Sequence, residues 1–105
     1  MNIQKLMKQA QQAQAQMAVV QEELAQQTVE ASAGGGMVKV IMTCDRNLQQ
    51  VKIDPDVTDP AMSPDDVELL EDMIVAAITE ASRSAEATAA AKMDEITGGL
   101  NIPGL

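Results

Sequence analysis

The chain has 105 residues, enough for one domain, and 46% of them are hydrophobic, as is typical of a protein that folds. Seven basic residues against sixteen acidic ones give a formal net charge of −9, and the sequence contains no Phe, Tyr, Trp or His. The chain therefore has no aromatic ring on which a base could stack, which disfavours a role in binding single-stranded nucleic acid. Without His, the chain lacks the commonest general base and metal ligand.

The negative charge is concentrated in one segment. Residues 54–80 contain nine acidic residues and no basic one, whereas the first 21 residues contain Lys5 and Lys8 and no acidic residue. An acidic pI argues against a protein that coats DNA indiscriminately. One face of the molecule can nevertheless be neutral or basic, because the acidic residues are not spread evenly.

Residues 1–28 are expected to form a helix with a seven-residue repeat. Its apolar positions, separated alternately by three and four residues, are Ile3, Leu6, Ala10, Ala13, Met17, Val20 and Leu24. The intervening Gln, Ala and Glu residues favour helix formation. The apolar stripe is narrow, so it requires a second helix beside it. The positions assigned to a core or dimer contact are Leu6, Met17, Val20 and Leu24.

Residues 29–54 predict a meander of three antiparallel strands. Gly34-Gly35-Gly36 is expected to form the first turn and Cys44-Asp45-Arg46-Asn47 the second. Apolar side chains alternate with polar ones, as expected for a sheet with one buried face. The strand residues assigned to the core or to a dimer contact are Val38, Val40, Val51 and Ile53.

Residues 55–62 form an acidic, Pro-containing connector, and residues 63–97 predict a long helix. Ser63 and Pro64 are a favourable helix start, and Leu70 belongs to the apolar stripe that follows. Gly98-Gly99 is expected to end this helix, which leaves residues 98–105 as an apolar tail.

The predicted fold class is therefore α+β, in one domain, with the order helix, three-stranded antiparallel sheet, long helix (α-β-β-β-α). Each helix is longer than three short strands can cover, and the sheet has two open edges. A homodimer with joined sheets and projecting helical arms solves both problems.

No catalytic, metal or cofactor site is expected. Cys44 is the only cysteine and is interpreted as a small buried residue. The triple glycine lacks the Lys-Ser/Thr of a phosphate-binding loop. The acidic residues from Asp54 to Asp65 do not match a calcium loop, which needs Gly at its sixth position and Glu at its twelfth. No apolar run is long enough to span a membrane, and we expect a cytoplasmic protein that is not an enzyme.

Several segments together resemble one bacterial family. These segments are Leu6-Met7-Lys8-Gln9-Ala10-Gln11-Gln12, the Gly-rich turn before Val38-Lys39-Val40, Val51-Lys52-Ile53-Asp54-Pro55, Leu70-Glu71-Asp72-Met73 with Ala76-Ala77, and Thr97-Gly98-Gly99-Leu100 with Ile102-Pro103-Gly104. In this order they resemble the YbaB/EbfC nucleoid-associated proteins over nearly the whole chain. The resemblance implies a homodimer that binds double-stranded DNA in the nucleoid through its projecting helices.

The resemblance also implies which residues contact DNA. Basic positions on the two helices are Lys5 and Lys8 on the first, and Arg83 and Lys92 on the last. Because the chain has few lysines and a large negative charge, DNA binding is expected to be weak and sensitive to salt. It is also expected to have little sequence specificity, or specificity through DNA shape.

A different class of function is the alternative. The acidic segment and the Met-rich apolar surface would also suit a coiled-coil module or chaperone-like dimer that binds a protein partner and has no DNA activity.

Overall fold

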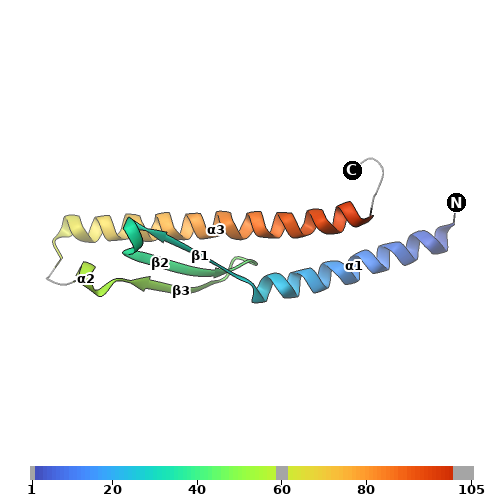
Figure 1. Cartoon of the computed structure of the whole chain (residues 1–105), viewed down its shortest axis with the longest axis horizontal. Coiled ribbons are helices and arrows are strands. Elements are labelled where there is room, and N and C mark those ends of the chain that lie inside the picture. Colours follow the sequence, from blue (N-terminus) through green and yellow to red (C-terminus); the bar gives the residue numbers. More distant parts are fainter. Residues whose placement is uncertain (1, 59–61, 101–105) are drawn as a thin grey trace.

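The computed structural model describes residues 2–58 and 62–100 of the chain. Its elements are α1 (Ile3–Gln26), β1 (Thr28–Ala33), the short 3₁₀ turn η1 (Gly34–Gly36), β2 (Val38–Thr43), β3 (Leu48–Ile53), α2 (Pro55–Thr58) and α3 (Pro64–Leu100). The molecule measures 72 × 24 × 17 Å, and its radius of gyration is 20.2 Å (Figure 1). A compact chain of this length would have a radius of gyration of about 13 Å. The single chain is therefore elongated, with both long helices extending beyond the sheet.

The sheet is the predicted antiparallel meander, with the strand order β1-β2-β3. Val40 in the central strand pairs with Ala31 on one side and with Val51 on the other. A register shift between Ile41 and Met42 marks a bulge in the β2–β3 pair. The first turn uses glycine because Gly34, Gly35 and Gly36 all have positive φ, a conformation that L side chains rarely adopt.

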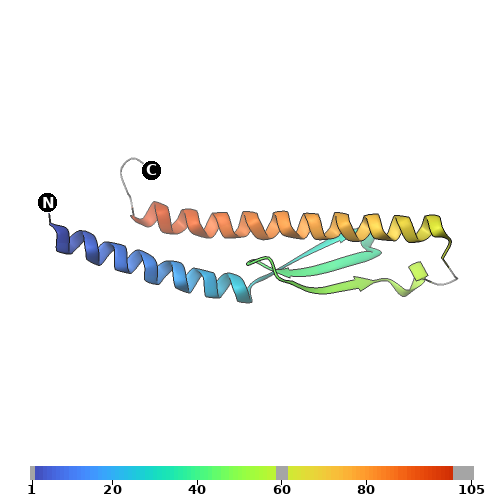
Figure 2. The same cartoon turned by 180° about the vertical axis from the view of Figure 1, so that it is seen from behind.

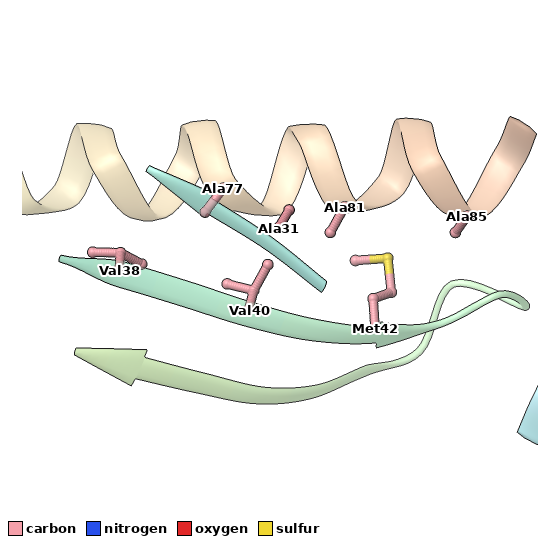
Figure 3. Packing of buried hydrophobic residues seen from close by; sticks show 7 residues of the cluster. All are labelled: Ala31, Val38, Val40, Met42, Ala77, Ala81 and Ala85. Atoms are coloured by element: carbon pink, nitrogen blue, oxygen red, sulfur yellow. The ribbon is translucent and has the colours of Figure 1, made fainter. Parts of the chain in front are cut away.

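The core lies between α3 and the first two strands. Three alanines of α3, spaced by four residues and fully buried, face the sheet: Ala77, Ala81 and Ala85. Opposite them lie Ala31 of β1 with Val38, Val40 and Met42 of β2 (Figure 3). The methyl side chains allow the helix backbone to approach the sheet closely, so small residues on α3 complement larger ones on β2.

The turn between β2 and β3 connects the sheet to both long helices, α1 and α3. The backbone N–H of Cys44 donates to the carbonyl oxygens of Leu24 at 3.0 Å and Gln27 at 2.9 Å, which holds the end of α1 against the sheet. Cys44 is 2% exposed, in agreement with its interpretation as a small buried residue. Arg46 has a φ of 71° and forms an ion pair with Glu86 of α3 at 3.1 Å.

The structure differs from the predicted elements in two places. The connector contains the one-turn helix α2, which begins at Pro55 after the Asp54 carboxylate accepts the Asp56 backbone N–H at 3.0 Å. Proline suits a first helical position as well as the end of a strand, and here it does both. In addition, α3 continues through Gly98-Gly99 to Leu100. Glycine in a helix costs about 1 kcal/mol relative to alanine, which weakens a helix without ending it. The rest of the predicted tail, 101–105, lies outside the described residues.

The predicted core positions divide into two groups. Leu24, Val38 and Val40 are buried, Leu70 is partly buried against the core, and Val20 is half-buried. The others are exposed in the single chain, with exposed fractions of 49% for Leu6, 37% for Met17, 38% for Val51 and 37% for Ile53. Apart from Leu24 and Val20 near its C-terminal end, the apolar stripe of α1 is therefore not buried within this chain, and neither are the apolar residues of β3.

Candidate nucleic-acid interface

Two helical arms project from the sheet on the same side. One arm is α1, and the other is the C-terminal half of α3, which runs beside α1 in the opposite direction (Figures 1 and 2). The start of α1 and the end of α3 therefore lie at the same end of the molecule, which we call the open end. The sheet and α2 lie toward the other end. This arrangement agrees with the predicted projecting helices.

The arms meet near their base. Lys92 Nζ of α3 donates to Glu23 Oε2 of α1 at 2.9 Å. Farther toward the open end, a groove of about 440 Å³ separates the helices, lined by Ala15, Gln16, Val19, Val20, Glu95 and Ile96. The lining is mostly apolar and has no basic side chain. The groove is consequently unsuited to phosphate, and any DNA contact by the arms has to come from other residues.

Lys5 and Lys8 lie in the first two turns of α1, at the open end. The helix begins there because the Asn2 side chain accepts the Lys5 backbone N–H at 3.2 Å, a normal N-cap. Residues three apart share one face of a helix, so the two ammonium groups project from the same side. Both side chains are exposed, and neither forms an ion pair with any described residue. Their charges are available to an external anion.

The other two predicted DNA contacts are paired within the chain. Arg83 is 3.3 Å from Glu80, one turn earlier on α3, and Lys92 is bonded to Glu23. The hydrogen bond to Glu23 raises the pKa of Lys92 above its ordinary value. Exposed pairs such as Arg83–Glu80 are weak, so Arg83 can exchange its partner for phosphate at little cost. Lys92 would have to leave the contact that joins the arms.

The acidic segment is placed away from Lys5 and Lys8. Its described members lie toward the end of the molecule opposite the open end (Figure 1). They are Asp54, the acidic residue of α2 and those in the N-terminal half of α3. Exposed charges farther apart than about 10 Å are largely screened at moderate salt. Separation along the 72 Å axis therefore limits the repulsion that this segment exerts on an anion at the open end.

Two further unpaired lysines were not predicted as site residues. Lys39 of β2 and Lys52 of β3 are directly opposite each other in the register of the sheet. Within the part of the chain that the structure describes, neither forms an ion pair. Their adjacency depends on the strand register, which a bulge shifts, so residue types alone did not indicate it. Alternation placed Lys39 on the face away from the core, and that was the available signal.

The amino-acid sequence was compared with known families. The YbaB/EbfC DNA-binding family matches residues 1–100. The chain belongs to the YbaB/EbfC DNA-binding family. A nucleoid-associated protein of Thermoanaerobacter pseudethanolicus is 53% identical over 104 residues, which cover 99% of this chain and 90% of that protein. A nucleoid-associated protein of Akkermansia muciniphila is 47% identical over 103 residues, covering 98% of this chain and 95% of that one.

A solved structure shows the same fold. The crystal structure of an uncharacterized protein from Helicobacter pylori superposes with a TM-score of 0.79, at 16% sequence identity, over 92% of this chain and 98% of that one. The fold of this chain is thus shared by a protein of distant sequence. The family is a DNA-binding family and not an enzyme family, as expected. Among the described residues, no helix is long and apolar enough to cross a membrane.

Proposed function

We propose that this YbaB/EbfC protein is a homodimer that binds double-stranded DNA through phosphate contacts from its projecting helices, and that it serves nucleoid organisation or gene regulation. The observation that carries the proposal is the unpaired Lys5–Lys8 face at the open end, within a stretch of 21 residues free of acidic side chains. Relatives that share about half of its residues are named nucleoid-associated proteins.

The single chain exposes too much surface for a compact monomer. Its accessible area is 7547 Å², whereas a compact protein of its mass has about 5,700 Å². The excess is larger than the roughly 800 Å² per partner that a standard interface buries. This surplus supports a dimer.

The third strand is the best candidate for the dimer contact. Every residue of β3 is exposed, and β3 forms an edge of the sheet, so its outer backbone groups can pair with another strand. The apolar residues Leu48, Val51 and Ile53 pair with the buried residues of β2 but are left uncovered, because α3 packs on β1 and β2. A second copy placed along β3 would cover them and would join the two sheets.

The mode of DNA binding follows from charge. A dimer would carry twice the formal charge of −9, so long-range repulsion opposes its approach to DNA. Few lysines are available, and each one that contacts a phosphate releases counterions. Binding should therefore be of low affinity, steeply dependent on salt and only slightly dependent on base sequence.

The test is binding to fluorescently labelled duplex DNA at salt concentrations from about 25 to 200 mM. The label belongs on the DNA because the protein has neither Trp nor Tyr. We expect binding at low salt that declines steeply as salt rises, and charge reversal of Lys5 and Lys8 should abolish it. Absence of binding at the lowest salt would contradict the proposal and favour the protein-binding alternative.

A matched pair of variants tests the site. Lys5→Gln/Lys8→Gln removes two positive charges at the open end of α1. Gln21→Glu/Gln26→Glu adds two negative charges near the base of the same helix, where both glutamines are exposed. Both variants change the net charge equally. The lysine variant should lose more affinity. The slope of its log binding constant against log salt concentration should become less steep by about 0.9 for each phosphate that it no longer binds. Equal losses would show that net charge, not the Lys5–Lys8 face, governs binding.

A further inference from the structure

We propose that Lys39 and Lys52 form a second phosphate-binding site, on the outer face of the sheet, that takes a phosphate of the DNA backbone. This inference rests on the proposed DNA binding but concerns a different surface from the arms. None of the DNA contacts assigned above includes either lysine.

The register of the sheet places the two lysines opposite each other. Lys39 lies between the buried residues Val38 and Val40, and it pairs directly with Lys52 of β3. Successive side chains of a strand point to opposite faces, so both lysines project from the face away from α3. Side chains directly opposite in an antiparallel pair start about 4.5–5.5 Å apart at Cβ, and like charges in such positions destabilise the sheet.

No acidic side chain neutralises this pair through an ion pair within the described part of the chain. The ion pairs among the described residues are formed by Arg46, Arg83 and Lys92 with glutamates elsewhere. The lysine pair thus combines two positive charges at a position where a strand would ordinarily place opposite or neutral groups. An anion bound between them would turn the repulsion into two charge-assisted hydrogen bonds.

The two lysines line a hollow on the surface. Its volume is about 250 Å³, and its other lining residues are Gly36, Ile53, Asp54 and Pro55. The hollow is several times larger than the roughly 30 Å³ that one water molecule occupies in the liquid, so a hydrated phosphate group fits. Gly36 has no side chain to occupy the entrance, and Lys39 Cε would lie 3.8 Å from a Cβ added there.

One acidic residue, Asp54, also lines the hollow. One oxygen of its carboxylate accepts the backbone N–H of Asp56 at 3.0 Å, as part of the turn that starts α2. Asp54 offsets part of the positive charge, which leaves two cationic groups against one anionic group. The geometry therefore favours a single phosphate group held by both lysines over a highly charged ligand.

The outer face would stay accessible in the proposed dimer. The uncovered apolar residues of β3 belong to the same face of the sheet as the core, whereas Lys39 and Lys52 belong to the opposite face. A partner that pairs with the edge of β3 and covers its apolar side reaches Ile53, one lining residue of the hollow, and leaves the two lysines on the opposite face open. The protein would then contact DNA at two places, the open end of the arms and the sheet.

The first experiment measures anion binding without DNA. In ¹H–¹⁵N NMR spectra of the full chain, millimolar inorganic phosphate should shift the amide signals of Gly36, Lys39 and Lys52 selectively and saturably. The variant Lys39→Gln/Lys52→Gln should lose these shifts, and Lys39→Arg/Lys52→Arg should retain them. No shift, or an equal response at every lysine of the chain, would overturn the site.

The second experiment measures DNA binding by the same variants. Relative to the wild-type protein, Lys39→Gln/Lys52→Gln should bind labelled duplex more weakly. The slope of its log binding constant against log salt concentration should be less steep by about 0.9 for each phosphate that it no longer binds. If the wild-type protein binds DNA and this variant binds it equally well, the sheet site is wrong while the proposed function stands. If the wild-type protein does not bind DNA, the proposed function fails, and with it the assignment of this site to DNA.

A stability measurement guards against loss of folding. Because removal of like charges relieves repulsion in the sheet, the glutamine variant should melt at the same temperature as the wild-type protein or higher. A much lower melting temperature would show that the lysines serve the fold, and would contradict a site kept for an external anion.

Discussion

Glu23 and Lys92 are 69 positions apart in the sequence, and their side chains join the bases of the two helical arms through a hydrogen bond of 2.9 Å. Leu24, the next residue of α1, is the one apolar residue of that helix that is buried among those the structure describes. Beyond this point toward the open end, α1 is largely exposed. The angle between the arms therefore depends on a small contact region, of which the Glu23–Lys92 ion pair is a part.

Alkaline pH should weaken this junction. The hydrogen bond to Glu23, aided by the charges of Glu23 and Glu95, raises the pKa of Lys92 in the folded protein above its ordinary value of 10.5. A group whose pKa rises on folding stabilises the folded state fully below its unfolded pKa, and this contribution is lost as the pH rises through the folded value. The melting temperature, followed by circular dichroism, should consequently fall as the pH passes 10.5.

The variant Lys92→Met isolates this effect from the titration of other groups. It should melt a few degrees at most below the wild-type protein at neutral pH, since exposed ion pairs contribute little. The difference in melting temperature between the two proteins should become smaller above the pKa of Lys92. A constant difference across the alkaline range would show that the methionine acts through packing and not through the missing charge.

Enlarging Ala81 should destabilise the protein. This residue is fully buried between Ala77 and Ala85, where α3 faces β1 and β2 (Figure 3). Added methylene groups in a well-packed core cost about 1–3 kcal/mol, so Ala81→Leu should lower the free energy of unfolding by that amount in a urea titration. Ala87→Leu, at an exposed position of the same helix, is the control and should change it by about 0.5 kcal/mol or less. Similar losses would mean that α3 is not held close to the sheet.

Alanine should be tolerated better at one position of the triple-glycine turn than at another. Gly34 and Gly35 have φ values of +64° and +67°, so alanine at either position carries left-handed strain of roughly 1–2 kcal/mol. A Cβ on Gly34 would also meet the side chain of Met73 on α3, whereas one on Gly35 would meet nothing within 4 Å. Gly34→Ala should therefore be more destabilising than Gly35→Ala in chemical denaturation.

The two effects at Gly34 can be separated. Shortening Met73 in the double variant Gly34→Ala/Met73→Ala removes the clash but not the backbone strain. A double-mutant cycle should accordingly show a favourable coupling between the two changes. Purely additive effects would indicate that the Met73 side chain moves aside freely and that only backbone strain matters.

Charges on β3 should disrupt the proposed dimer. Val51 and Ile53 are 38% and 37% exposed in the single chain, and a second copy along β3 would bury them. Val51→Asp/Ile53→Lys keeps the net charge and places ions in that interface, so light scattering should report the mass of one chain in place of two. The same double substitution at Val19 and Val75, which are exposed on α1 and α3, should leave the mass unchanged. A wild-type protein of monomeric mass would contradict the dimer itself.

Local sequence patterns determine most of the secondary structure here. The repeat of α1, the alternation in the strands and the glycines at the first turn act over a few residues, so each was recognisable without knowledge of its neighbours. The same holds for Ser63 and Pro64 at the start of α3, where Ser63 Oγ accepts the Asp66 backbone N–H at 3.2 Å. The two differences from the prediction arose where Pro and Gly have alternative roles, at α2 and at Gly98-Gly99.

Whether a charged side chain is paired depends on contacts between segments that are distant in the sequence. Lys92 pairs with Glu23 only because the helices run side by side, and Lys39 lies opposite Lys52 only because the strands adopt one register. Sequence patterns are periodic along one element, whereas ion pairing depends on distances of a few ångströms between elements. Composition and spacing therefore determine the helices, the meander and the acidic segment, and the tertiary arrangement decides which lysines remain open to an anion.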